Sequence, residues 1–373
     1  MQLLNATEMV AGYTMGLEPN GHERLVVVVK GTFEIPEDGS EPRLAADQVP
    51  LVMADEFFGE PGLSAMRHES DFALVKPRCD VLVVGSAHAP DGRPTDRVSV
   101  GFRLGSLVKT FDVVGDRVWD GRRPTPAQFF VRKAIHYGVA YGGMDAHREH
   151  PERQQTYATN PVGVGFYPIS RGAALVGKPL PNTEETRTPV TSTNGQYRPM
   201  AFGPLGRNFD PRFRFAGTYD QRWQDETFPF LPADFDTKYF QSAPADQQME
   251  YPLGGEEVAL LNLTPAGRAF FRLPTVDVPV EFTNVAYERT EARAIVDTIV
   301  IEPDQRRVTL VWRTSHALKR NLLEIRQVVV GRMSPAWYRA RRLGKTYYVS
   351  IAAIPRKSNS EPGAAGSSNG HSA

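Results

Sequence analysis

The chain has 373 residues, which is enough for two domains or one large domain. Its 43 basic and 43 acidic residues cancel, which argues against a general nucleic-acid binder and gives no electrostatic attraction to an anionic membrane. Cys79 is the only cysteine, so a disulfide framework within the chain is excluded, and its thiol is either a small core group or a reactive one. The first residues lack the pattern of a secretory signal, and no stretch approaches the roughly 20 apolar residues of a membrane span, so we expect a cytoplasmic protein.

Residues 1–120 have the pattern of an antiparallel β region. Residues 24–35 are rich in β-branched side chains, and residues 71–86 contain a continuous apolar run. Residues 97–104 alternate apolar and polar side chains, and a second short strand follows over residues 107–114. This succession predicts a meander of short strands, as in a sandwich or a barrel.

Residues 121–255 differ from this pattern, because Pro and Gly are frequent and apolar runs are short. Residues 126–137 predict one short helix or an extended arm. Strand signals then return in residues 256–354. The strands predicted there are 258–263, 270–273, 276–282, 294–302, 307–313, 322–330 and 347–354. Residues 335–342 predict a helical turn with a basic face, and residues 355–373 predict a disordered tail.

The expected fold is therefore mainly β. Antiparallel sandwich-like or barrel-like sheets lie at both ends of the chain, and a long, ordered, coil-rich segment lies between them. The pattern leaves open whether the two β regions form one joint sandwich or two domains.

Residues 198–247 combine many aromatic side chains with Pro, Gly, Asp and Arg but show no sustained periodicity. Aromatic side chains supply apolar area to bury, so we expect an ordered, irregular segment whose shape serves binding. Alternating aromatic and Arg residues are typical of protein interfaces, although they also occur packed within a fold or stacked on single-stranded nucleic acid. The candidate protein-binding residues are Arg212, Phe213, Arg214, Tyr219, Arg222, Trp223 and Tyr239.

Sequence patterns for catalysis are weak. The carboxylates of the middle segment could act in pairs as in glycosidases, but beside Pro and Gly they are more typical of turns and caps. His136, His147 and His150 are the clustered histidines, and His147 and His150 are spaced as on one helix face. However, Pro151 follows at once, and a metal site would need a third ligand that the sequence does not identify. No Gly-x-Ser-x-Gly, phosphate-binding loop or dinucleotide fingerprint occurs. We therefore expect no catalytic residues, no cofactor and no metal site.

Several segments match the pattern of a known family. They are residues 27–33 (VVVKGTF), 58–62 (FGEPG), 76–83 (KPRCDVLV), 142–143 (GG), 160–166 (NPVGVGF), 180–184 (LPNTE), 202–204 (FGP), 216–223 (AGTYDQRW), 228–236 (FPFLPADFD) and 241–248 (QSAPADQQ). Together they resemble the bacterial family called domain of unknown function 2169, over about residues 5–330. The resemblance implies a type VI secretion setting in a Gram-negative bacterium, in which members act as effector adaptors or chaperones and not as enzymes.

These observations predict a cytoplasmic adaptor that binds a type VI secretion effector, or its spike-associated N-terminal region, and helps to load it onto the spike. The expected partners are the effector, the spike-tip protein or both, without nucleic acid or membrane. Two alternatives stay open. One is a carbohydrate-active enzyme or lectin that uses the aromatic and acidic middle segment, and the other is a structural component of the injection apparatus.

Overall fold

The computed structural model describes residues 1–37, 39–146, 151–345 and 347. The chain divides into two units, Met1–Gly331 and Arg332–Ala373. The described part of the second unit contains the helix α2 (Pro335–Arg342), where the sequence predicts a helical turn. The strand predicted over residues 347–354 lies outside the described residues except for Tyr347, and the predicted tail lies wholly outside them.

The largest sheet of the first unit combines strands from both ends of the sequence. Its order is β17 (Gln248–Met249), β7 (Cys79–Val83), β22 (Ile295–Glu302), β23 (Arg307–Ala317), β3 (Glu23–Glu34) and β2 (Val10–Leu17), with β4 (Arg43–Leu44) paired to β3. The longest strand pairing in this sheet is between β3 and β23. It is antiparallel and runs from Arg24 opposite Ala317 to Glu34 opposite Arg307. The N-terminal and C-terminal β regions are therefore joined in one sheet.

Two further sheets also combine strands from the N-terminal and C-terminal regions. The five-stranded sheet has the order β16 (Thr183–Glu184), β10 (Leu107–Val114), β9 (Arg97–Leu104), β18 (Glu257–Leu261) and β19 (Arg268–Arg272). The four-stranded sheet has the order β1 (Gln2–Asn5), β24 (Ile325–Val330), β20 (Pro279–Asn284) and β21 (Arg289–Arg293). The remaining pairs are β5 (Glu56–Phe57) with β6 (Met66–His68), β8 (Gly85–His88) with β11 (Arg132–Ile135), β12 (Tyr141–Gly142) with β15 (Val164–Gly165), and β13 (Met144–Asp145) with β14 (Gln155–Thr156).

Most strand pairs are antiparallel, and the sheets of the described residues are open. The predicted mainly β fold with a coil-rich middle is thereby confirmed. Within residues 126–137 the extended alternative is the correct one, because that stretch leads into β11 and not into an α-helix. Short 3₁₀ helices punctuate the loops: η1 (Pro90–Gly92), η2 (Tyr137–Val139), η3 (Pro151–Arg153), η4 (Gly172–Leu175), η5 (Arg212–Ala216), η6 (Thr237–Phe240), η7 (Ala245–Gln247), η8 (Pro303–Gln305) and η9 (Leu322–Glu324).

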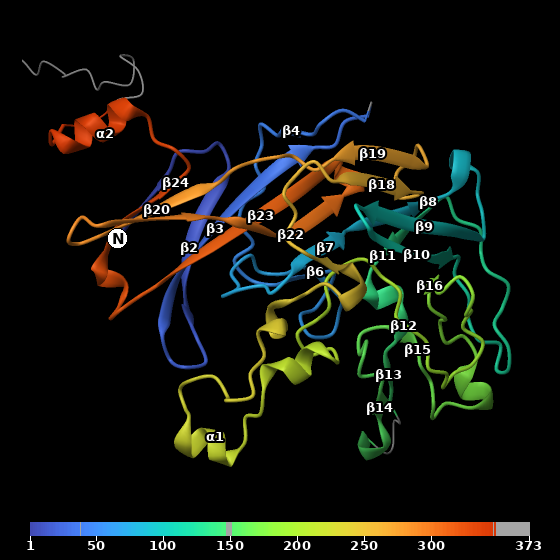
Figure 1. Cartoon of the computed structure of the whole chain (residues 1–373). Coiled ribbons are helices and arrows are strands. Elements are labelled where there is room, and N and C mark those ends of the chain that lie inside the picture. Colours follow the sequence, from blue (N-terminus) through green and yellow to red (C-terminus); the bar gives the residue numbers. More distant parts are fainter. Residues whose placement is uncertain (38, 147–150, 346, 348–373) are drawn as a thin grey trace, which may run out of the picture. The chain divides into compact units, whose positions relative to one another are not determined.

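The apolar run of β3 reflects burial on both faces of the central sheet. Val27 and Val29 belong to the main core between the sheets, whereas Val26 and Val28 face a smaller cluster that includes Phe72. A strand that is covered on both faces gains from apolar side chains at every position, so the sequence does not alternate. In Figure 1 the green and yellow middle segment of the first unit lies below these sheets.

Candidate protein-binding surface

Six of the seven predicted binding residues lie on three short helices of the middle segment, η5, the α-helix α1 (Gln221–Glu226) and η6, and Tyr219 lies in the loop between η5 and α1. Figure 1 shows α1 well away from the sheets of the first unit, at the far end of this segment. We call residues 213–235 the aromatic arm. Because the arm contributes no strand to any sheet, its position depends on side-chain contacts at its two ends and on the Phe230 ring, which lies beside Gly21 of the β2–β3 turn.

Arg212 anchors the beginning of the arm. Its side chain is only 2% exposed, and its guanidinium donates to the carboxylate of Glu69, to the Leu205 carbonyl at 2.7 Å and to the Tyr239 carbonyl at 2.9 Å. The guanidinium carbon also lies 5.7 Å from the ring centre of Tyr239, in a cation–π contact. Arg212 and Tyr239 therefore bind each other within the fold, and we leave both out of the exposed surface.

A second set of buried polar side chains holds the chain after the arm. The carboxylate of Asp80 on β7 accepts from the Gln241 side chain and from the Ser242 backbone N–H, the latter at 2.8 Å. The Gln247 side chain, which is fully buried, donates to the Val81 carbonyl at 2.7 Å. Buried polar contacts thus hold the chain on both sides of the arm, to Glu69 before it and to the central sheet after it.

The arm itself presents aromatic rings that pack edge to face. Tyr219 and Trp223 meet edge to face at 4.7 Å, and Trp223 and Phe228 do so at 5.7 Å. The Trp223 indole N–H donates to the Phe230 carbonyl at 2.9 Å, and the Asp220 side chain caps α1 by accepting from the Trp223 backbone N–H at 2.8 Å. The rings hold one another in place while Phe228 stays 66% exposed, and Tyr219 and Phe230 are exposed as well.

The remaining predicted residues are exposed, and the two basic ones are locally paired. Phe213 is 63% exposed and lines a shallow hollow with Arg214. Arg214 pairs with Asp210 at 2.6 Å, and Arg222 pairs with Glu226 at 2.9 Å, each four positions away in the sequence. Exposed pairs of this kind add little stability, so the guanidinium groups can exchange partners at low cost.

The structure thus brings Tyr219, Arg222 and Trp223 together on the arm, with Phe213 and Arg214 at its start. Sequence reasoning did not select Phe228 and Phe230, because no Arg alternates with them. The signal that could have found them is the run Phe228-Pro229-Phe230-Leu231-Pro232, in which the prolines exclude a regular element that would bury both rings.

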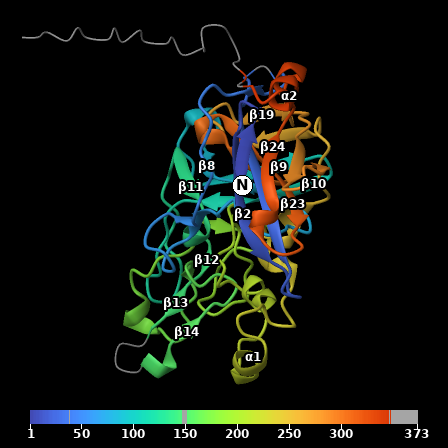
Figure 2. The ribbon, with the colours of Figure 1, turned by 90° about the vertical axis from the view of Figure 1, so that its left-hand side faces the viewer.

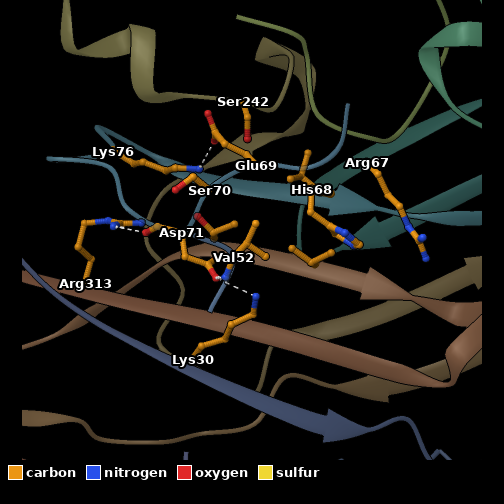
Figure 3. Close-up of a pocket in the computed structure, with 13 residues that line it drawn as sticks. Lys30, Val52, Arg67, His68, Glu69, Ser70, Asp71, Lys76, Ser242 and Arg313 are labelled. Atoms are coloured by element: carbon orange, nitrogen blue, oxygen red, sulfur yellow. Dashed lines mark hydrogen bonds and ion pairs between the residues drawn. The ribbon is translucent and has the colours of Figure 1, made fainter. Parts of the chain in front are cut away.

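A buried charge network beside the arm is the main alternative site (Figure 3). Lys30 pairs with Asp71 at 2.8 Å, and Lys76 pairs with Asp80 at 2.7 Å and with Glu69 at 3.2 Å. All of these groups except Asp80 line a cavity of about 30 Å³, which has room for a water molecule but not for a sugar ring. The size of the cavity argues against a carbohydrate site here.

The electrostatics of this network stabilise the charged forms of its members. Burial alone would raise the pKa of Glu69, but Arg212, Lys76 and Arg207 outweigh it and lower that pKa to about 2. Burial alone would lower the pKa of Lys76, but Asp80, Glu69 and Asp297 outweigh it and raise that pKa to about 12. A general acid or base works best with a pKa near the working pH, so these groups are suited to holding the fold.

The other chemical candidates have structural partners. The His136 ring accepts from the Gly138 N–H at 3.1 Å and stacks on Phe58, and Cys79 is fully buried. In the described part of the chain no group of three His, Cys, Asp or Glu side chains could hold a metal ion, and His147 and His150 lie outside it. Caps, ion pairs and side-chain hydrogen bonds account for the carboxylates of the middle segment: Asp210, Asp220, Asp225, Glu226, Asp234, Asp236 and Asp246.

Comparison with known proteins identifies the family. The family described as "Uncharacterized protein conserved in bacteria (DUF2169)" matches residues 20–313. The chain belongs to this family. A search of curated proteins and a search of solved structures both return no match. Among the described residues of this DUF2169 protein, no helix has the length and apolar character needed to cross a membrane.

Proposed function

We propose that this DUF2169 protein is a cytoplasmic adaptor that binds a type VI secretion effector, or the spike-associated N-terminal region of one, and helps to load it onto the spike. The observation that carries the proposal is the group of rings that pack edge to face on the arm, in which Tyr219 and Phe228 are exposed and Trp223 lies half-buried between them. A monomeric protein rarely exposes a contiguous aromatic group of this kind without a partner to cover it.

The arrangement of the arm supports binding in a second way. Its two ends are fastened by buried polar contacts, at Arg212 and at Asp80, so the exposed rings do not need to hold the fold together. Rings whose positions are set before binding lose little conformational entropy when a partner covers them. Trp, Tyr and Arg are also the residue types that dominate interface energetics.

The direct test is co-expression with each effector and spike protein encoded by neighbouring genes, followed by size-exclusion chromatography. The proposal predicts a stable complex with at least one of them. Separate elution from all of these proteins would refute the adaptor role. Fractionation of secreting cells adds a second readout, because an adaptor stays in the cytoplasm whereas a structural component travels with the secreted spike.

Trp223→Ala tests the aromatic arm within such a complex. Removing a ring at the centre of an interface costs about 2 kcal/mol of binding, which is roughly a 30-fold rise in Kd. Phe270→Ala on β19 is a matched control, because Phe270 is an exposed aromatic residue away from the arm. Equal affinities for the two variants, with normal melting of both, would remove Trp223 from the interface.

A further inference from the structure

The strand β2 differs from the other strands that end a sheet. It has eight residues with the sequence VAGYTMGL, which contains no charged residue and no Pro. Its counterparts β19 and β21 have five residues each and carry Arg at both ends, and β1, β16 and β17 have four residues or fewer. Natural sheets protect exposed edges with short strands, charges or Pro, because an open edge pairs with other chains. The edge of β2 lacks all three protections.

The hairpin turn shows which backbone groups of β2 face outward. The Glu18 N–H donates to the His22 carbonyl at 2.9 Å, so residues 18 and 22 form a hydrogen-bonded pair of the ladder. Bonded and non-bonded pairs alternate along an antiparallel ladder. Ala11, Tyr13 and Met15 therefore direct their N–H and C=O groups away from β3, as does Leu17. In the described residues no strand pairs with this edge, which Figure 2 places down the middle of the view.

An apolar groove runs beside this edge. Met15 and Leu17 line it together with Leu322 and Leu323, and Leu323 is 80% exposed. Val285, also exposed, lies next to them because its N–H donates to the carbonyl of residue 324 at 2.9 Å. A strand added to the edge would therefore find apolar side chains to pack on.

The rim of the groove is basic. Lys319 and Arg320 are exposed and directly precede Asn321, which lines the groove. The Glu324 carboxylate is occupied by the backbone N–H groups of Lys319 and Arg320, at 2.6 and 3.3 Å, so it does not pair with their cationic ends. Among the described residues that line the groove, Glu23 is acidic. The charge of this rim complements an acidic partner.

We propose that the edge of β2 binds an extended segment of the secreted partner as an added β-strand, with apolar side chains toward Met15 and Leu323 and carboxylates toward Lys319 and Arg320. This inference deepens the proposed function and rests on it. A second copy of the chain fits less well. In a two-fold antiparallel pair, the Leu323 end of one copy would face the Val10 end of the other, which is preceded by the exposed polar residues Asn5 and Glu8.

Hydrogen–deuterium exchange of the complex with the co-eluting effector or spike protein tests the strand pairing. Peptides covering residues 9–18 should exchange at least tenfold more slowly in the complex, because the outward N–H groups of Ala11, Tyr13, Met15 and Leu17 become bonded. Unchanged exchange in a stable complex would overturn this inference while leaving the adaptor role standing. The absence of any complex would refute the adaptor role, and this inference with it.

Paired variants at Met15 test the same edge. Met15→Pro removes an outward N–H without removing a bond to β3, so it should melt near the wild type but bind at least tenfold more weakly. Met15→Thr keeps the donor and should bind within about threefold. Equal binding by the two variants would contradict strand addition.

Two further measurements cover the other outcomes. If Met15→Pro does not fold, the double change Lys319→Glu with Arg320→Glu still tests the site, because it should weaken binding about tenfold and flatten its salt dependence. Light scattering of the isolated protein tests for a second copy. A dimer that Met15→Thr keeps and Met15→Pro dissolves, with the effector bound elsewhere, would overturn the proposal.

Discussion

Replacing Arg212 by Met tests whether a buried ion pair fixes the aromatic arm. The change keeps an unbranched side chain of similar length but removes the donors to Glu69, Leu205 and Tyr239. Breaking one side of a buried pair costs about 3–5 kcal/mol, because the other charge stays buried without its partner. Glu69 keeps Lys76 at 3.2 Å, which favours the lower end of this range.

The two carbonyls add to this cost, since each loses a donor worth about 1 kcal/mol. We therefore expect Arg212→Met to lower the free energy of unfolding by about 5 kcal/mol and the Tm by roughly 10 °C. Arg214→Met is the matched control, because Arg214 has the same side chain two residues later but is exposed and pairs only with Asp210. Its cost should stay below about 0.5 kcal/mol.

Urea unfolding followed by circular dichroism measures both variants, and limited proteolysis reports on the arm. In Arg212→Met the bonds after residues 214 and 222 should be cut by trypsin before the sheets unfold. A double-mutant cycle with Glu69→Gln isolates the pair, and a coupling of about 1–3 kcal/mol is expected. Equal stability of Arg212→Met and Arg214→Met, with equal resistance to trypsin, would refute the view that Arg212 anchors the arm.

Three further predictions follow from other buried groups. The pKa of Glu69 is about 2 in the folded protein and 4.5 in the reference state. Its ionised form therefore contributes about 3 kcal/mol to the free energy of unfolding above pH 4.5, and this contribution is lost as the pH falls toward 2. In urea unfolding, Glu69→Gln should lose less stability than the wild type over that pH range. Burial, with Asp297 and Asp80, raises the pKa of the Cys79 thiol, so a maleimide at pH 7 should label it in urea but not in the native protein, and rapid native labelling would contradict this. Gly142→Ala should cost about 2–4 kcal/mol in urea unfolding, because φ is +149° and a Cβ would lie 2.2 Å from the Asn160 carbonyl oxygen, whereas Gly203→Ala meets no atom within 4 Å and should cost less than about 1 kcal/mol.

The strands of the core were predictable where local composition and tertiary environment agree. The β-branched run of β3 and the alternation of β9 are signals of this kind, and both strands are found. β2 was missed because Gly12 and Gly16 lower its strand propensity. The structure supplies their reason, since a Cβ on either would lie within 2.5 Å of a leucine side chain of the segment that covers this face. That requirement is tertiary, and a single sequence does not show it.

The sequence indicates the segment that contains the candidate site, but it does not indicate which residues of that segment are buried and which are exposed. The density of aromatic and Arg residues indicates residues 198–247 as a special segment, yet it does not separate Arg212 from Arg214. The difference arises because Arg212 meets Glu69, which lies 143 positions away in the sequence. Contacts of that separation follow from the assembled sheets, so the burial of one Arg and the exposure of the other could not be derived locally.

The exposed arm and the buried charges are consequences of one physical requirement. An irregular segment lacks the repeated ladder bonds that order a strand, so its order must come from individual side-chain contacts. Buried charged groups such as Arg212 and Asp80 serve this purpose well, because a buried charge that loses its partner costs several kcal/mol and each one therefore accepts only one geometry. Apolar contacts would tolerate sliding, and they would also use the rings that the arm exposes. Because polar groups at both ends set the geometry, the rings of Tyr219 and Phe228 can stay exposed on the arm.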